Sequence, residues 1–131
     1  MTRFVLDASA GVELLLDTTR GRALASQLPD SGEWWVPEHY YLEVASALRR
    51  SAQRNVITRT QADDAFRMLE RSIFNRAQVR PLLPDAWRRR EAMTVADALH
   101  VALAEHLGAT LVTADIRLAG APSLGVPTIV P

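Results

Sequence analysis

Short, mainly apolar segments alternate with longer amphipathic stretches along this chain. The segments at residues 3–6, 34–36 and 110–113 are too short for helices and predict buried strands. Residues 78–80 and 126–130 are two further strand candidates. Short strands without a polar face are typical of a parallel sheet that is covered on both sides.

Between these segments, apolar residues recur at helical spacing and predict helices. The expected helices run from near Ser9 to Leu16, Gly21 to Leu28, Pro37 to about Gln53, Thr58 or Thr60 to Ile73, Pro84 to Ala92, and Val95 to Leu107. The last helix, between a Thr94 cap and Gly108, is apolar on nearly every side, which predicts that it is buried. The alternation of strands and helices predicts one α/β domain over residues 1–131, with a mainly parallel sheet.

The composition is that of an ordinary globular domain, with 48% hydrophobic and 23% charged residues. No apolar run approaches the roughly 20 residues of a membrane span, and no secretory signal opens the chain, so we expect a cytoplasmic protein without membrane contact. The absence of cysteine excludes disulfides and thiolate chemistry. All 15 basic residues are Arg, which excludes mechanisms that need a lysine amine.

Four carboxylates lie at positions where a site is expected. Asp7 and Asp115 follow predicted strands, and in parallel sheets ligands bind beyond the carboxyl ends of the strands. Glu43 and Asp97 lie within Ala-rich helical segments. If the fold brings these four carboxylates together, their negative charges must be neutralised by protons or by a divalent cation. This pattern indicates a metal-dependent phosphoryl-transfer enzyme.

Each carboxylate also has a purely structural interpretation. Asp7 and Asp115 are suited to cap the helical segments that follow them, although Ser9 competes with Asp7 for that role. Asp97 forms a potential capping box with Thr94. Glu43 falls on the helix face opposite an apolar stripe and taken alone is a solvated residue. The case for a site is therefore cumulative.

Four segments of the chain resemble the four acidic motifs of PIN-domain ribonucleases, specifically the VapC-type toxins of bacterial toxin–antitoxin pairs. The segments are Phe4–Ala10, Pro37–Arg50, Asp97–Glu105 and Leu111–Asp115, and the resemblance extends from Phe4 to about Val130. It implies a three-layer α/β/α sandwich with a short, mainly parallel central sheet. One departure is His100, where the family often has tyrosine or another aromatic residue.

The resemblance also implies the residues of a metal site. Asp7, Glu43, Asp97 and Asp115 match the metal-binding acids, with Glu43 as a peripheral ligand, and Ser9 and Thr113 match supporting hydroxyl residues. Oxygen-only ligands suit Mg²⁺, with Mn²⁺ as an alternative, and one or two ions are expected. The implied reaction is hydrolysis of an RNA phosphodiester by a metal-activated water.

Partners follow from the same resemblance. Phosphate contacts of the RNA substrate are expected at Arg49, Arg50 and Arg117. A small cognate antitoxin and a homodimer are expected, with the helices around residues 21–28 and 38–73 as docking surfaces. The three histidines are interpreted as packing or surface residues, the three tryptophans as core or dimer contacts, and Arg88–Arg90 as a solvated run.

Other classes of protein fit less well. A receiver domain needs a second acid beside Asp7 and a site lysine, and a haloacid-dehalogenase-type phosphatase needs an Asp where Ser9 stands. A dinucleotide-binding module needs a Gly-rich loop after the first strand. Two alternatives stay open: a catalytically silent PIN-like module for RNA binding or scaffolding, and a housekeeping PIN nuclease without an antitoxin.

Overall fold

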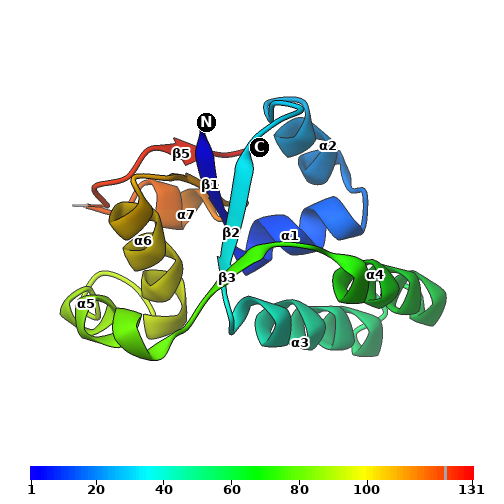
Figure 1. The fold of residues 1–131 in the computed structure, drawn as a ribbon. Helices are drawn as coiled ribbons and strands as arrows, with labels where there is room; N and C mark the ends of the chain where they lie inside the picture. Colours follow the sequence, from blue (N-terminus) through cyan, green and yellow to red (C-terminus); the bar gives the residue numbers. More distant parts are fainter. Residues whose placement is uncertain (123) are drawn as a thin grey trace.

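A computed structural model describes residues 1–122 and 124–131 of the chain, and at its centre is one five-stranded sheet. The strands lie in the order β3-β2-β1-β4-β5, and every neighbouring pair is parallel (Figure 1). Their bounds are β1 Arg3–Leu6, β2 Glu33–Pro37, β3 Asn75–Ala77, β4 Thr110–Val112 and β5 Thr128–Ile129. The strand order reverses direction between β1 and β4, so the C-terminal ends of these two strands form the switch point of the sheet.

Helices cover both faces of the sheet. Their bounds are α1 Ala8–Leu15, α2 Thr19–Ala25, α3 Tyr40–Gln53, α4 Arg59–Arg71, α5 Leu83–Arg88, α6 Val95–Leu107 and α7 Ile116–Ala119, with a short 3-10 helix at Arg80–Leu82. Figure 1 shows α1 to α4 on one side of the sheet and α5 to α7 on the other. The predicted three-layer α/β/α sandwich with a parallel sheet is therefore confirmed.

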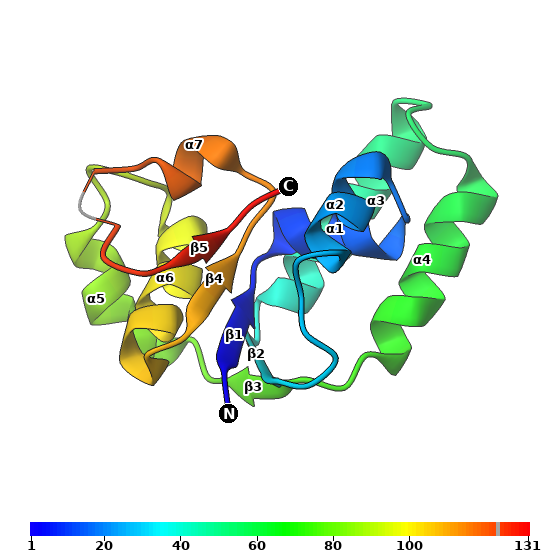
Figure 2. The same cartoon turned by 90° about the horizontal axis from the view of Figure 1, so that it is seen from above.

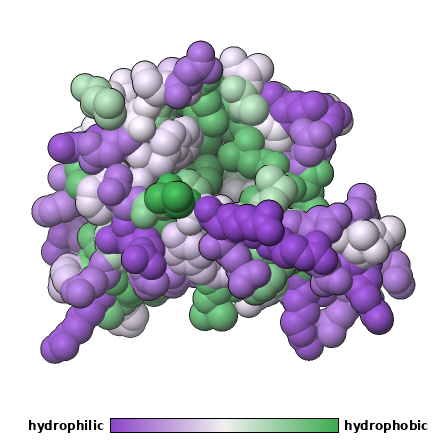
Figure 3. All heavy atoms as spheres, turned by 45° about the vertical axis from the view of Figure 1, so that its right-hand side comes forward, coloured by the Kyte–Doolittle hydropathy of each residue, from purple (hydrophilic) through white to green (hydrophobic). Residues whose placement is uncertain are grey.

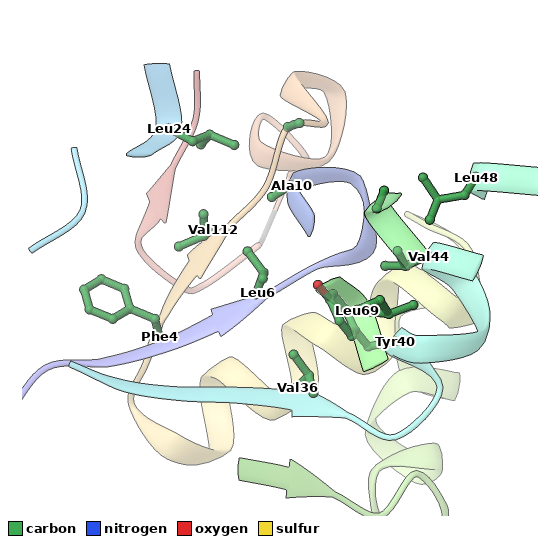
Figure 4. Packing of buried hydrophobic residues seen from close by; sticks show 12 residues of the cluster. Phe4, Leu6, Ala10, Leu24, Val36, Tyr40, Val44, Leu48, Leu69 and Val112 are labelled. Atoms are coloured by element: carbon green, nitrogen blue, oxygen red, sulfur yellow. The ribbon is translucent and has the colours of Figure 1, made fainter. Parts of the chain in front are cut away.

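The alternation of side chains along β1 and β4 directs neighbouring residues into hydrophobic clusters on opposite faces of the sheet. On β1, Phe4 and Leu6 pack into the core beneath α1 to α4, whereas Val5 packs into the core beneath α6 and α7. On β4, Val112 belongs to the first core and Leu111 to the second. Figure 4 shows the first core, where side chains of the strands meet those of the helices above them. The central strands are buried on both faces, as their sequences predict.

The fully apolar segment before Gly108 forms α6, with the predicted bounds. Thr94 caps it by accepting from the Asp97 backbone N–H, and Gly108 ends it in the left-handed conformation at φ 62°. The seven residues from 98 to 104 are all buried. The prediction of a buried helix is confirmed, which places Asp97 at the first turn of a helix that lies in the core.

Several predicted boundaries are wrong, and pairing across the sheet explains two of them. Pro37 ends β2 instead of starting a helix, because it lies in register with Ala77 of β3, and α3 begins at Tyr40. The strand expected at residues 78–80 lies at Asn75–Ala77 instead. This edge strand is largely exposed and polar, so its sequence carries no apolar signal.

Several helix ends differ from the predicted ones because of local capping contacts. Asp7, and not Ser9, caps α1, and α2 starts behind a Thr18 cap and ends at Ala25. A Thr58 capping box starts α4, but the helix stops at Arg71 and leaves Ile73 94% exposed instead of on an apolar helix face.

Two interpretations of charged and aromatic residues also need correction. Arg89 is not part of a solvated run, because its side chain is only 15% exposed and pairs with Asp85 and Glu105. Trp87 is 59% exposed and lies under the Arg90 guanidinium, so it is not a core residue. Among the described residues, no helix combines the length and apolarity that crossing a membrane requires.

Candidate functional site

An open cleft of about 580 Å³ lies at the C-terminal edge of the sheet, over the switch point. All four predicted carboxylates line it: Asp7, Glu43, Asp97 and Asp115. They come from four separate segments, at the ends of β1 and β4 and in the first turns of α3 and α6. The fold thus brings together the four acids that the sequence distributes over more than 100 residues.

Asp7 is anchored by the helix that follows it. Its Oδ1 accepts the Ala10 backbone N–H at 2.9 Å and the Ser9 hydroxyl at 2.7 Å. The residue is 3% exposed, and within the described residues these hydrogen bonds reach only Oδ1. Asp7 therefore acts as a helix cap with one oxygen and keeps Oδ2 available to the cleft.

Ser9 and Thr113 join the two loops of the switch point. The Ser9 Oγ accepts the Ala114 backbone N–H at 3.0 Å and lies 3.3 Å from the Thr113 hydroxyl. Thr113 in turn accepts the Asp115 backbone N–H at 3.0 Å. Because these contacts fix the loop after β1 against the loop after β4, they hold the backbone of both acids in place.

Asp115 repeats the arrangement of Asp7 at the end of β4. Its Oδ1 accepts the Leu118 backbone N–H at 3.1 Å and so caps α7. The other oxygen, Oδ2, lies 3.7 Å from the guanidinium of Arg117, whose side chain is 85% exposed. Capping and a place in the cleft are thus compatible for both Asp7 and Asp115.

Asp97 is the acid whose environment opposes its charge. Burial raises the pKa of the Asp97 carboxyl, a hydrogen bond with Thr94 opposes that rise, and the neighbouring charge of Asp7 adds to it. The charge of Asp115 acts in the same direction as that of Asp7. A carboxyl whose charge is opposed by burial and by neighbouring acids, in a cleft, is a candidate for a functional site.

Glu43 is held by two histidines, of which the sequence placed only His39 on the same helix face. Its Oε1 lies 2.8 Å from Nε2 of His100 and 3.0 Å from Nε2 of His39. Burial alone would raise the pKa of Glu43, but the hydrogen bonds and charges of His100 and His39 lower it to about 2. With a side chain 28% exposed and paired, Glu43 is not the solvated residue that its helical position suggested.

The interpretation of all three histidines as packing or surface residues is therefore wrong for two of them. His39 and His100 form a group with Glu43 in which the potential ligand atoms lie within 4.8 Å of one another. His100 is far from Glu43 in the sequence, so spacing gave no signal for it, whereas His39 precedes Glu43 by four residues and shares its helix face. The available signal was a polar residue, His100, inside an otherwise apolar stretch of helix.

The arginines are distributed unevenly around the cleft. Arg50 lines it, whereas Arg49 is exposed on α3 and is not among its lining residues. Arg117 borders an adjoining hollow that also contacts Asp97. Arg20 of α2 also lines the cleft, where it donates to the Ala114 carbonyl, and no sequence motif identified it.

A fifth acid, Glu13, also lines the cleft and was not predicted. Its carboxylate accepts the Thr18 hydroxyl and lies 3.8 Å from Arg20. Like Asp115, which lies near Arg117, Glu13 is paired with an arginine of the protein. Arg20 thereby offsets part of the negative charge on this side of the cleft.

The residues of the cleft fit a divalent cation with a preference for oxygen ligands. The four carboxylates supply hard oxygen donors, and hydrogen bonds anchor one oxygen each of Asp7, Glu43 and Asp115. Among the described residues the opposite oxygens of these three accept no hydrogen bond, although Oδ2 of Asp115 lies 3.7 Å from the exposed Arg117 guanidinium. Carboxylate oxygens suit Mg²⁺ or Mn²⁺.

Comparison of the sequence with known proteins identifies one family. The family model of the PIN domain matches residues 4–123. "Ribonuclease VapC12" of Mycobacterium tuberculosis is 40% identical over 116 residues, which is 88% of this chain and 88% of that protein. "Ribonuclease VapC3" of the same organism is 39% identical over 118 residues, which is 89% of this chain and 85% of that protein.

Comparison of the structure with solved structures identifies the same fold. PAE2754 from Pyrobaculum aerophilum superposes with a TM-score of 0.65 at 21% identity, covering 97% of this chain and 89% of that one. A chain of VapBC2 from Rickettsia felis, solved with a DNA fragment from its promoter, has a TM-score of 0.64 at 13% identity, covering 98% of both chains. At such identities the likeness concerns the fold alone.

Proposed function

This chain belongs to the PIN-domain family, among the VapC ribonucleases, and from that premise we propose that it is a metal-dependent endoribonuclease and the toxin of a toxin–antitoxin pair. One observation carries the proposal to this particular chain. Four carboxylates from four segments line a single cleft, and three of them keep one oxygen free of hydrogen bonds. Such a donor set is suited to hold a cation against an RNA phosphate.

We assign the residues of the cleft separate tasks within this proposal. Asp7, Asp97 and Asp115 would hold Mg²⁺ or Mn²⁺, as one or two ions, and Glu43 would be a peripheral ligand. When bound, the metal supplies an activated water and offsets the charge that develops on the phosphate. Ser9 and Thr113 are supporting residues, because their hydroxyls fix the two loops that carry the acids.

The arginines around the cleft are the proposed contacts for the RNA backbone. Arg50 and Arg20 line the cleft itself, so either guanidinium can approach the phosphate at the site of cleavage. Arg117 borders the adjoining hollow, and Arg49 is exposed one residue before Arg50. We propose that these two contact phosphates farther along the strand.

Cleavage of RNA by the purified chain tests the proposal. We expect cleavage with Mg²⁺ or Mn²⁺ and none with a chelator, and a circular RNA should be opened because the activity is endonucleolytic. Asp7→Asn should abolish cleavage while the fold survives, because asparagine caps helices as well as aspartate does. Cleavage by Asp7→Asn at the parental rate would refute the metal site, and a parent inactive with both metals would refute the nuclease assignment.

We also propose partners and a location. The structural likeness to VapBC2 supports a small antitoxin for this chain, and the proposed RNA substrate supports a cytoplasmic location. A homodimer is proposed through the exposed apolar residues of α5, Leu83 and Trp87.

Growth arrest on expression, relieved by co-expression of the neighbouring small reading frame, would support the toxin assignment, and a lack of arrest would refute it.

A further inference from the structure

Glu43 and two histidines form a compact polar group where the two helical layers meet at the cleft. Nε2 of His100 and Nε2 of His39 both contact the same carboxylate oxygen, Oε1 of Glu43, at 2.8 and 3.0 Å. The two imidazole rings lie close together, with centroids 4.8 Å apart. Since α3 and α6 cover opposite faces of the sheet, the contact between Glu43 and His100 bridges the two layers (Figure 1).

The surroundings of the rings determine which nitrogen carries the hydrogen. Nε2 of His39 also lies 3.2 Å from the Ala96 carbonyl, and a carbonyl can only accept, so this Nε2 is a donor. No described residue offers a hydrogen-bond partner to Nδ1 of either ring. Nε2 of His100 faces only the Glu43 carboxylate, which is an acceptor when ionised. Both rings are thus Nε2–H donors: His100 donates to Oε1 of Glu43, and His39 donates to the Ala96 carbonyl while its Nε2 lies 3.0 Å from the same carboxylate oxygen.

This arrangement argues against a metal bound by the histidines themselves. A metal at Nε2 needs the lone pair of that nitrogen, and the hydrogen would then move to Nδ1. Histidines that ligate a metal almost always donate their other N–H to a carboxylate, a carbonyl or water. Here Nδ1 of His39 and Nδ1 of His100 are buried, and neither has an acceptor among the described residues.

We propose that His39 and His100 are positioning residues, which hold Oε1 of Glu43 and thereby direct its Oε2 into the metal cleft. We call this group the Glu43 clamp. The proposal rests on the proposed metal-dependent nuclease function, and it deepens it by assigning a task to residues outside the four acids. His100 is the principal member, because it is 1% exposed and its Nε2 has no other hydrogen-bond partner among the described residues.

The position of His100 on α6 makes the clamp specific to this site. His100 lies three residues after Asp97, so the two side chains share one face of the helix, and both line the cleft. One helix therefore supplies a proposed metal ligand directly and orients a second ligand that belongs to α3. Removing the His100 donor should leave Glu43 free to rotate away from the cleft without changing the other three acids.

Substitutions at His100 test the clamp through metal binding as well as cleavage. His100→Phe keeps a ring of similar size but removes the donor, and we expect Mn²⁺ binding, measured by titration calorimetry, to weaken about 10-fold, with a similar loss of cleavage rate. His100→Gln, which retains an N–H donor, should stay close to the parent. The matched control is His106→Phe on the exposed end of the same helix, which should change neither quantity.

A double-mutant cycle separates positioning from a general structural effect. If His100 acts through Glu43, His100→Phe should have no further effect on Mn²⁺ binding or cleavage once Glu43→Gln is present. A penalty of equal size in both backgrounds would refute the clamp, because the ring would then act by packing alone. A loss from His100→Phe no larger than that from His106→Phe would refute it as well.

The tautomers of the rings provide a test that does not depend on activity. Nitrogen-15 spectra of the metal-free protein should show hydrogen on Nε2 of His39 and of His100, and hydrogen on Nδ1 of either would overturn the clamp. One equivalent of Zn²⁺ that binds the parent but not His100→Gln would also overturn it, by showing a histidine metal site. A parent that cleaves no RNA but shows both Nε2–H tautomers would refute the nuclease assignment and leave the clamp geometry intact.

Discussion

Three of the four predicted carboxylates use one oxygen for structure and, among the described residues, leave the other without a hydrogen bond. Oδ1 of Asp7 and Oδ1 of Asp115 each cap a helix, and Oε1 of Glu43 accepts from His100 and lies 3.0 Å from Nε2 of His39. A side chain held at one oxygen loses little further freedom when the other oxygen binds a ligand. The structural and functional interpretations of these acids are therefore complementary, since the cap or clamp supplies the orientation that a metal site requires.

Asp97 should limit the stability of the metal-free protein. Burial raises the pKa of its carboxyl, so its ionised form is less favourable in the folded chain than in the unfolded chain. We expect Asp97→Asn to raise the melting temperature at neutral pH by about 2–4 °C. The same substitution should abolish metal-dependent cleavage, which is the usual relation between a strained active site and stability.

The gain in stability from Asp97→Asn should depend on pH, and its direction follows from the raised pKa. A carboxyl with a raised folded pKa stabilises the fold only while it is protonated, and that contribution is lost as the pH rises through the folded pKa. The difference in free energy of unfolding between Asp97→Asn and the parent should therefore grow from acid to neutral pH and be small below the ordinary carboxyl range. Urea titrations at several pH values without metal would measure it, and a constant difference would contradict this origin.

At the scale of elements, the sequence predicts the buried segments and misses those that depend on pairing. β1 and α6 were predictable because their apolar residues mark them as core. β3 was not, because Asn75–Ala77 is a polar edge strand that forms only against β2. The four acids could be identified from motifs, whereas the contact between Glu43 and His100 depends on how α3 and α6 meet across the sheet.

The contact between α1 and α2 should tolerate no side chain at Gly21. A Cβ at this position would collide with the backbone carbonyl of Glu13 in α1, and backbone cannot rotate away as a side chain can. We expect Gly21→Ala to lower the free energy of unfolding by about 1–3 kcal/mol. Since Arg20 precedes Gly21 on α2 and lines the cleft, the cleavage rate should fall too.

A second glycine provides the control for this prediction. A Cβ at Gly120 would lie 3.5 Å from its nearest neighbour, the Ile116 carbonyl oxygen, which is ordinary contact. Gly120→Ala should therefore leave the urea midpoint close to that of the parent. Equal midpoints for Gly21→Ala and the parent would show that α2 can move away from α1 without cost.

Across the whole molecule, a second hollow lies away from the acidic cleft. It has a volume of about 260 Å³ and is lined mainly by apolar residues, which include Leu14, Leu15, Leu28, Ile73 and Phe74. Figure 3 shows one face of the molecule on which apolar residues gather at a hollow bordered by hydrophilic ones. Figure 2 shows α4 on the same side of the sheet as α1 and α2, and residues of α1 and of the segment after α4 line the hollow. Exposed apolar residues around a hollow are typical of a protein-binding surface.

We expect this hollow to bind the antitoxin, because Ile73 is 94% exposed at its rim and contributes little to the core. Ile73→Asp should leave the melting temperature and RNA cleavage nearly unchanged but weaken binding of the antitoxin by at least about 10-fold, since it introduces a charge where apolar contacts are expected. Val56→Asp is the control, because Val56 is 73% exposed but does not line the hollow. Calorimetric titration with the co-expressed antitoxin would measure both variants. If Ile73→Asp binds the antitoxin as tightly as Val56→Asp does, the antitoxin uses another face. Relief of growth arrest by the antitoxin in cells that express Ile73→Asp would lead to the same conclusion.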